Sequence, residues 1–238
     1  MVESSEPARR PAEDPAAADP VYRDAVIDLL GVLSYGEISA FERLADDSKL
    51  APTMQDKVAL ATMAAAELGK VDSLHGRIAD LGGDPYAAMA PFRVAIDEFH
   101  RHTAPSDWLE GLVKAFVGDG LANDFYREIA AFLDPITREI VVASLDDDGG
   151  HAAFVVERVR QVIAVDPRLS GRLALWGRRL MGEALTQAQR IAADRDSLTA
   201  LLTGGVDRPG LDLAALGRMF TRLTERHADR MSELGLDS

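Results

Sequence analysis

The chain has 238 residues, of which 47% are hydrophobic and 27% charged, a balance typical of a globular protein with one sizeable core. It contains no cysteine, which excludes a disulfide scaffold, cysteine-based zinc or iron–sulfur sites and thiol nucleophiles. The formal net charge of −13 argues against a protein that coats nucleic acid, and no apolar run approaches the roughly 20 residues of a membrane span.

Residues 1–20 carry four prolines among alanine, serine and acidic residues. Such a segment has too little apolar surface to order itself, so we expect a disordered tail. It also lacks the apolar stretch of a signal peptide. We therefore expect a cytoplasmic protein without membrane contact, whose folded domain spans residues 21–238.

The rest of the chain predicts helices throughout, because apolar residues recur at spacings of three and four and no stretch alternates with period two. Prolines and glycines divide it into long segments, as in an antiparallel helical bundle. The expected segments are 20–46, 52–81, 85–102, 105–133, 135–165, 167–203 and 209–235. We expect an all-α fold, with a four-helix bundle over about 21–165 and additional C-terminal helices over about 167–235.

Polar side chains interrupt the apolar stripes of the four long bundle segments. The interrupting residues are Glu37, Glu67, Asp119 with Asn123, and Asp148 with His151. Each of these segments thus directs a carboxylate toward the middle of the bundle. Several buried carboxylates cannot all stay ionised without cations, so the bundle needs metal ions, basic partners or protonated carboxyl groups. Carboxylate and imidazole ligands together suit iron, manganese or zinc.

The fifth segment has two interpretations, because Gly149 and Gly150 precede His151. Each glycine costs a helix about 1 kcal/mol relative to alanine, which favours a turn. The apolar stripe resumes in phase after the glycines, which favours a continuous helix over 135–165. We take the continuous helix as the expectation and keep the turn as the alternative.

With these residues in place, the chain resembles the ferritin-like superfamily, and within it the actinobacterial proteins grouped with MiaE-like tRNA hydroxylases. The segments that carry the resemblance are YGEISAFERLADD (35–47), MAAAELGKVDSLHGRI (63–78), LVKAFVGDGLANDFYREIA (112–130), DDDGGHAAFVVERVRQVI (146–163) and LALWGRRLMGEALTQAQR (173–190). The resemblance implies a ferritin-like bundle and O₂-dependent hydroxylation of a modified tRNA adenosine at a non-haem di-iron site. It also implies iron ligands at Glu37, Glu67, Asp119, Asp148 and His151, with Glu67 as the bridging carboxylate.

Lys70 departs from this pattern, because it stands where the family has histidine. A protonated lysine has no lone pair and cannot bind a metal. The predicted metal site can then have three states. It holds two metal ions, or one ion bound by Asp119, Asp148 and His151, or no metal. In the last two cases Lys70 would pair with Glu67 or Glu37. The cofactor is then one or two iron ions, with manganese as an alternative, or no metal.

Three functions remain open at this point. The first is a MiaE-like oxidoreductase, and the second is a non-catalytic ferritin-fold protein that acts through protein contacts. The third is an iron-storing cage, against which the C-terminal extension and Lys70 both argue. His100 and three other histidines have no partner at ligand spacing and are interpreted as surface or satisfied core residues.

Residues 156–195 form an arginine-rich region with eight arginines against four carboxylates. This charge would attract tRNA phosphates, which is the first interpretation. The second is salt bridging on the helix surface or a subunit interface in a homodimer. No aromatic RNA-stacking motif accompanies the arginines, so the second interpretation is favoured.

Overall fold

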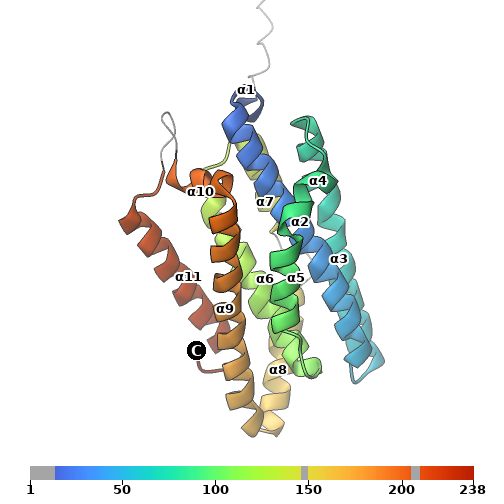
Figure 1. The fold of residues 1–238 in the computed structure, drawn as a ribbon. Helices are drawn as coiled ribbons and strands as arrows, with labels where there is room; N and C mark the ends of the chain where they lie inside the picture. Colours follow the sequence, from blue (N-terminus) through green and yellow to red (C-terminus); the bar gives the residue numbers. More distant parts are fainter. Residues whose placement is uncertain (1–13, 146–149, 205–209) are drawn as a thin grey trace, which may run out of the picture.

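The computed structural model describes residues 14–145, 150–204 and 210–238. The described chain is helical, and its longer helices run roughly parallel to one axis (Figure 1). These are α2 (Pro20–Asp47), α3 (Met54–Asp80), α5 (Arg93–His102), α6 (Trp108–Ala130), α7 (Pro135–Ser144), α8 (His151–Val165), α9 (Arg168–Asp194) and α11 (Leu213–Glu233). Shorter elements are α1 (Pro15–Ala18), α4 (Pro85–Met89), α10 (Asp196–Thr203) and the 3₁₀ turns η1 (Ser48–Leu50) and η2 (Ala90–Phe92). The prediction of an all-α fold is confirmed.

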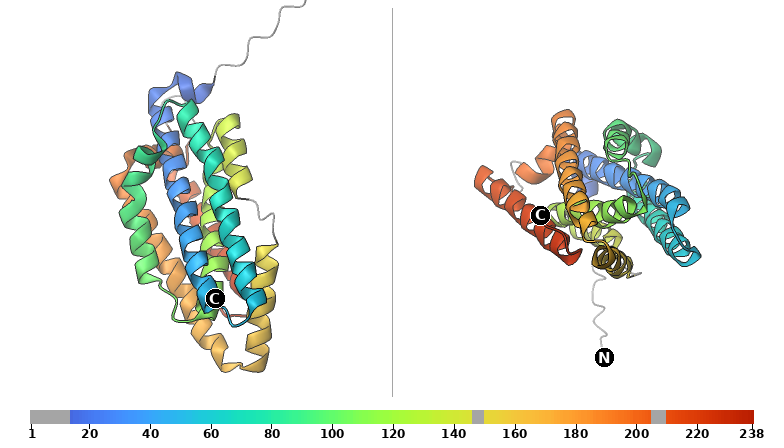
Figure 2. Two further views of the ribbon diagram at one scale, coloured as in Figure 1. Left: turned by 90° about the vertical axis from the view of Figure 1, so that its right-hand side faces the viewer. Right: turned by 90° about the horizontal axis from the view of Figure 1, so that it is seen from below.

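Helices α2, α3, α6 and the α7–α8 pair form the four-helix bundle, and α5, α9, α10 and α11 cover its open side. Seen from below, the other helices surround α6 (Figure 2), which packs against α2, α7, α8, α9 and α11. Acidic or hydroxyl side chains cap the helix starts: the Asp107 carboxylate accepts from the Glu110 amide, and the Asp134 carboxylate accepts from the Thr137 amide. These caps satisfy backbone donors that the helix itself leaves open.

The fourth bundle helix is broken, which corrects the expectation of one continuous helix over 135–165. Helix α7 ends at Ser144, and α8 begins at His151. Gly150 precedes α8 with φ of +65°, a left-handed conformation that glycine adopts without the steric cost of a side chain. The alternative interpretation, a turn that divides this segment, therefore agrees with the ends of α7 and α8.

Residues 14–20 belong to the folded domain, which corrects the expected boundary of the N-terminal tail at residue 20. The guanidinium of Arg77 in α3 is almost fully buried and binds Asp14 at 2.6 and 3.0 Å. It also donates to the Thr137 hydroxyl at 3.1 Å. Arg77 thus connects the start of the described chain with α3 and α7.

Two other expected helices are divided. The segment 85–102 forms α4, η2 and α5, and the segment 167–203 forms α9 and α10. Among the helices described, none is both long and apolar enough to cross a membrane.

Candidate functional site

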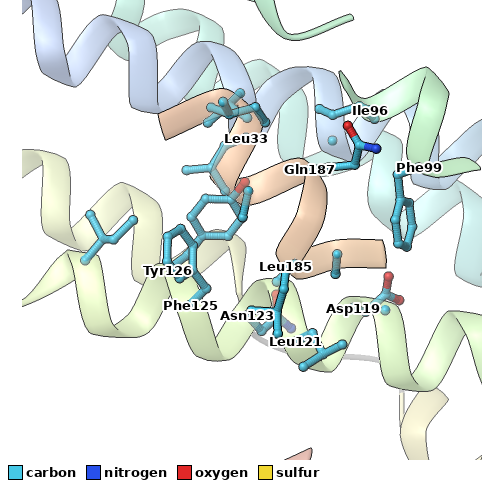
Figure 3. A pocket seen from close by; sticks show the side chains of 18 of the residues that line it. Leu33, Ile96, Phe99, Asp119, Leu121, Asn123, Phe125, Tyr126, Leu185 and Gln187 are labelled. Atoms are coloured by element: carbon cyan, nitrogen blue, oxygen red, sulfur yellow. The ribbon is translucent and has the colours of Figure 1, made fainter. Parts of the chain in front are cut away.

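A cavity of about 460 Å³ lies between the bundle and the helices that cover it. Its walls come from α2, α3, α5, α6, α9, α10 and α11, and most of the lining side chains are apolar. Figure 3 shows Phe99 and Asp119 together at one end and Tyr126 toward the other. The apolar walls include Leu33, Ile96, Phe99, Leu121, Phe125 and Leu185.

Three of the residues singled out from the sequence meet beside this cavity. The Lys70 ammonium lies 2.7 Å from Oε2 of Glu67 and 3.5 Å from Oε2 of Glu37. Glu37 and Glu67 are both buried, and the side chain of Lys70 is 20% exposed. The expected pairing of Lys70 with Glu67 or Glu37 is therefore confirmed, because Lys70 contacts both side chains.

The electrostatics of this cluster make it close to neutral at pH 7. Burial, together with a hydrogen bond to Glu67, raises the pKa of Glu37 to about 10, and the Lys70 charge opposes this only in part. Burial on its own would lower the pKa of Lys70, but Glu37 and Glu67 outweigh it, so this pKa is raised. Glu37 therefore keeps its proton while Lys70 keeps its charge.

Asp119 and Tyr126 extend the cluster along α6. Asp119 lines the cavity, and its charge raises the pKa of both Glu37 and Lys70. Tyr126 lines the cavity as well, and burial followed by the charge of Glu37 raises its pKa. The structure thus brings Glu37, Glu67 and Asp119 to one region, as expected.

The remaining two predicted ligands are not placed there. Asp148 lies outside the described residues. His151 is the first residue of α8 and is not one of the residues lining the cavity. Within the described ranges no group of three or more histidine, aspartate or glutamate side chains is positioned to hold a metal ion. The metal-ligand roles of these residues stay a prediction.

The donors at Glu37 and Glu67 do not fit a two-metal centre. The position next to both carboxylates is taken by the Lys70 ammonium, which donates hydrogen bonds and has no lone pair to offer. A metal ion there would also displace a charge-assisted bond of 2.7 Å. Lysine therefore supplies at this point the positive charge that buried carboxylates require.

A second group of polar residues at the cavity was not predicted as a site from the sequence. It consists of Arg43 and Asp47 from α2, His100 from α5 and Lys114 from α6. Lys114 is only 6% exposed, and its ammonium donates to the Thr103 carbonyl at 2.8 Å. It also lies 5.5 Å from the ring centre of Phe99. We refer to these four residues as the Lys114 cluster.

The charges of the Lys114 cluster are poorly compensated. Burial lowers the pKa of Lys114 to about 8, with Arg43 contributing in the same direction and Asp47 against it. Burial, together with Lys114 and Arg43, lowers the pKa of His100 to about 3. Among the described residues nothing hydrogen-bonds to the buried Nδ1 atom of His100, and its interpretation as an ordinary surface or satisfied core histidine stays a prediction. One feature of the sequence could have indicated this cluster: Lys114 lies inside the apolar run LVKAFV (112–117).

The arginine-rich region bonds to the rest of the chain. Arg158 binds the buried carboxylate of Asp56, Arg172 binds Glu110, and Arg190 lies 3.7 Å from Glu98. Arg178 donates to the Asp237 carbonyl and Arg179 to the His102 carbonyl. This geometry agrees with the interpretation as salt bridging on the helix surface. Binding of tRNA and formation of a homodimer stay predictions.

Comparison with known proteins identifies the family. A solved structure with a similar fold is "Protein 19 with aldehyde deformylating oxidase activity" from Synechococcus, with a TM-score of 0.69 and 19% sequence identity over 93% of this chain and 94% of that one. No curated protein matches the sequence. The family model for the ferritin-like domain of actinomycetes matches residues 20–205, which include α2 and α6 with their cavity-lining residues. The chain therefore belongs to the family of ferritin-like domains of actinomycetes.

Proposed function

We propose that this protein binds an apolar small molecule in the cavity of its ferritin-like bundle, without needing a metal ion at Glu37 and Glu67. The observation that carries the proposal is the apolar cavity of about 460 Å³ that ends on buried polar groups. Small-molecule sites in proteins have volumes of about 300–1,000 Å³, mostly apolar walls and a few convergent polar side chains. The cavity meets each of these criteria.

The neutral cluster of Glu37, Glu67 and Lys70 supports this function. A site whose carboxylates depended on bound cations would leave strong uncompensated charge on the cavity wall in their absence. Here the Lys70 bonds and the protonated Glu37 remove that charge. An apolar ligand can therefore bind next to this cluster without a metal ion or ordered water to neutralise its charge.

The test uses decanol, an uncharged ten-carbon alcohol, in isothermal titration calorimetry. We expect one decanol per chain. Gly118 lines the cavity, and a Cβ atom added there meets open space, so Gly118→Leu fills part of the cavity. This variant should weaken decanol binding about tenfold or more, which is at least about 1.4 kcal/mol.

Gly76→Leu is the matched control, because Gly76 is exposed on α3, away from the cavity, and its added Cβ also meets open space. The proposal predicts that Gly76→Leu binds decanol like the unchanged protein. No saturable binding, or equal losses in both variants, would rule out the cavity as the binding site.

The second candidate function is a ferritin-like oxidoreductase. Two observations favour it: the fold resembles that of an aldehyde deformylating oxidase, and Glu37, Glu67 and Asp119 gather at mid-bundle. The finer form, O₂-dependent hydroxylation of a modified tRNA base by a MiaE-like protein, is a prediction from the sequence. Glu37, Glu67 and Lys70 do not fit a di-iron centre, so we derive no reaction step through one.

Metal content separates the two candidates. Inductively coupled plasma mass spectrometry after anaerobic Fe(II) loading and desalting counts the ions on each chain. About two irons per chain would favour the oxidoreductase. About one iron, lost in Asp148→Ala, would place a single ion at Asp119, Asp148 and His151. A folded protein that retains none and binds decanol would favour the apolar-ligand function.

A further inference from the structure

We propose that Lys114 is a nucleophile that captures an apolar aldehyde or ketone from the cavity as an imine. This inference rests on the proposed function, because the carbonyl compound must first enter the cavity. It adds a covalent step, a reacting atom and a substrate class to the binding of apolar molecules.

The surroundings of Lys114 distinguish it from every other lysine in the chain. Lys49 and Lys57 are exposed, and Lys70 is held by two carboxylates. Lys114 is buried against the cavity, and its hydrogen-bond acceptor is the neutral Thr103 carbonyl. Within the described part of the chain no carboxylate forms an ion pair with its ammonium.

The buried position of Lys114 favours the free amine over the ammonium. Burial is the main cause of the pKa of about 8, and Arg43 on α2 adds repulsion, while Asp47 and Asp119 oppose it. About a tenth of Lys114 is then free amine at pH 7, against less than about a thousandth of an exposed lysine. Lysines activated in this way, by an apolar pocket or a second cation, form imines with carbonyl substrates.

The step balances without an external oxidant or reductant. The Nζ lone pair attacks the carbonyl carbon, the nitrogen loses its protons, and the carbonyl oxygen leaves as water, so that a C=N bond replaces the C=O bond. His100 lies in the same cluster as a neutral imidazole, and nothing among the described residues bonds to its Nδ1 atom. With its pKa lowered to about 3, this imidazole stays uncharged at pH 7 and adds no positive charge beside the amine.

The experiment treats the full-length protein with decanal and sodium cyanoborohydride at pH 7, which reduces an imine to a stable secondary amine. Intact-mass and peptide mass spectrometry then locate the added decyl group. Among the four lysines we expect one decyl group per chain at Lys114, at least about tenfold above Lys49 and Lys57, as its larger free-amine fraction predicts. Decanol in excess should suppress labelling of Lys114 and leave the exposed lysines unaffected.

Two variants complete the design. Lys114→Met keeps the volume of the side chain and removes the amine, and it should lose the specific decyl group. Lys57→Met is the same substitution at an exposed position and should retain it.

The outcomes separate the two proposals. Decanol binding without preferential labelling of Lys114 would overturn the imine and leave the apolar-ligand function standing. Equal labelling of all four lysines would assign the reaction to nonspecific amine chemistry. Labelling concentrated at Lys70 would place the reacting amine at Glu37 and Glu67 and refute the role of Lys114. Absence of both decanol binding and labelling would overturn both proposals.

Discussion

Lys70 and Lys114 line the same cavity from different helices, but their charges are balanced differently. Lys70 lies within 3.5 Å of two carboxylates, and its pKa is raised. Lys114 donates to a backbone carbonyl, and burial lowers its pKa to about 8. Lys70 has carboxyl partners that balance its charge. Lys114 has no such partner among the described residues, and its amine faces the ligand cavity.

This difference shows that burial alone does not decide the role of a lysine. Both ammonium groups are removed from water, and both pay a desolvation cost. The carboxylates beside Lys70 outweigh that cost, and the more distant Asp47 does not outweigh it for Lys114.

Lys70→His should change the metal content most, because it replaces an ammonium by a nitrogen with a lone pair beside Glu37 and Glu67. We expect the variant to retain about one additional iron per chain after anaerobic loading, measured by inductively coupled plasma mass spectrometry. Lys70→Met supplies the control, since it removes the cation without adding a ligand. Equal metal content in the two variants would contradict the prediction.

Lys70→Met should lower the free energy of unfolding by about 2–3 kcal/mol at pH 7, because it leaves Glu67 buried without its cation. The expected loss is below the full cost of breaking a buried pair because the Lys70 side chain is partly exposed. Urea unfolding followed by circular dichroism measures it. Lys57→Met, at an exposed position, should change it by less than about 0.5 kcal/mol.

Glu37→Gln should flatten the pH dependence of stability. Its pKa is about 10 in the folded protein and near 4.5 when exposed, so the folded state holds this proton over that interval and the unfolded state releases it. Stability therefore falls as the pH rises from 5 to 9, and the glutamine variant should lose at least about 1 kcal/mol of this fall. Urea unfolding across this range measures the slope, and an unchanged slope would show that Glu37 is ionised.

Lys114→Met should change the slope in the opposite direction. Because the pKa of Lys114 is lowered to about 8, the unfolded state binds more protons than the folded state between pH 8 and 10.5, and stability rises with pH there. The methionine variant should lack about 1 kcal/mol of this rise. A variant that instead lost stability equally at every pH would show that the pKa of Lys114 is not lowered by folding.

The grouping of Glu37, Glu67 and Lys70 was predictable from the sequence, because helical periodicity shows which side chains face the inside of the bundle. Glu37, Glu67 and Lys70 fall on inward-facing stripes of consecutive long helices, and consecutive helices in a bundle are neighbours. The general bundle and its C-terminal helices follow from the same pattern.

The Lys114 cluster was not predictable in this way. His100 and Lys114 approach each other because α5 returns along the open side of the bundle beside α9. Periodicity assigns a residue to a face of its own helix but does not say which other helix covers that face. The break before His151 was kept only as the alternative for another reason: the apolar stripe resumes in phase after Gly150, although the backbone there is left-handed.

Lys70 has a consequence for how the bundle responds to its surroundings. A bound ion can be diluted away or extracted by a chelator, and its occupancy follows supply. The positive charge beside Glu67 is instead carried by a side chain of the protein itself, only one helical turn from Glu67. Its effective concentration is set when the protein is synthesised, and this part of the fold should remain intact in cells starved of iron.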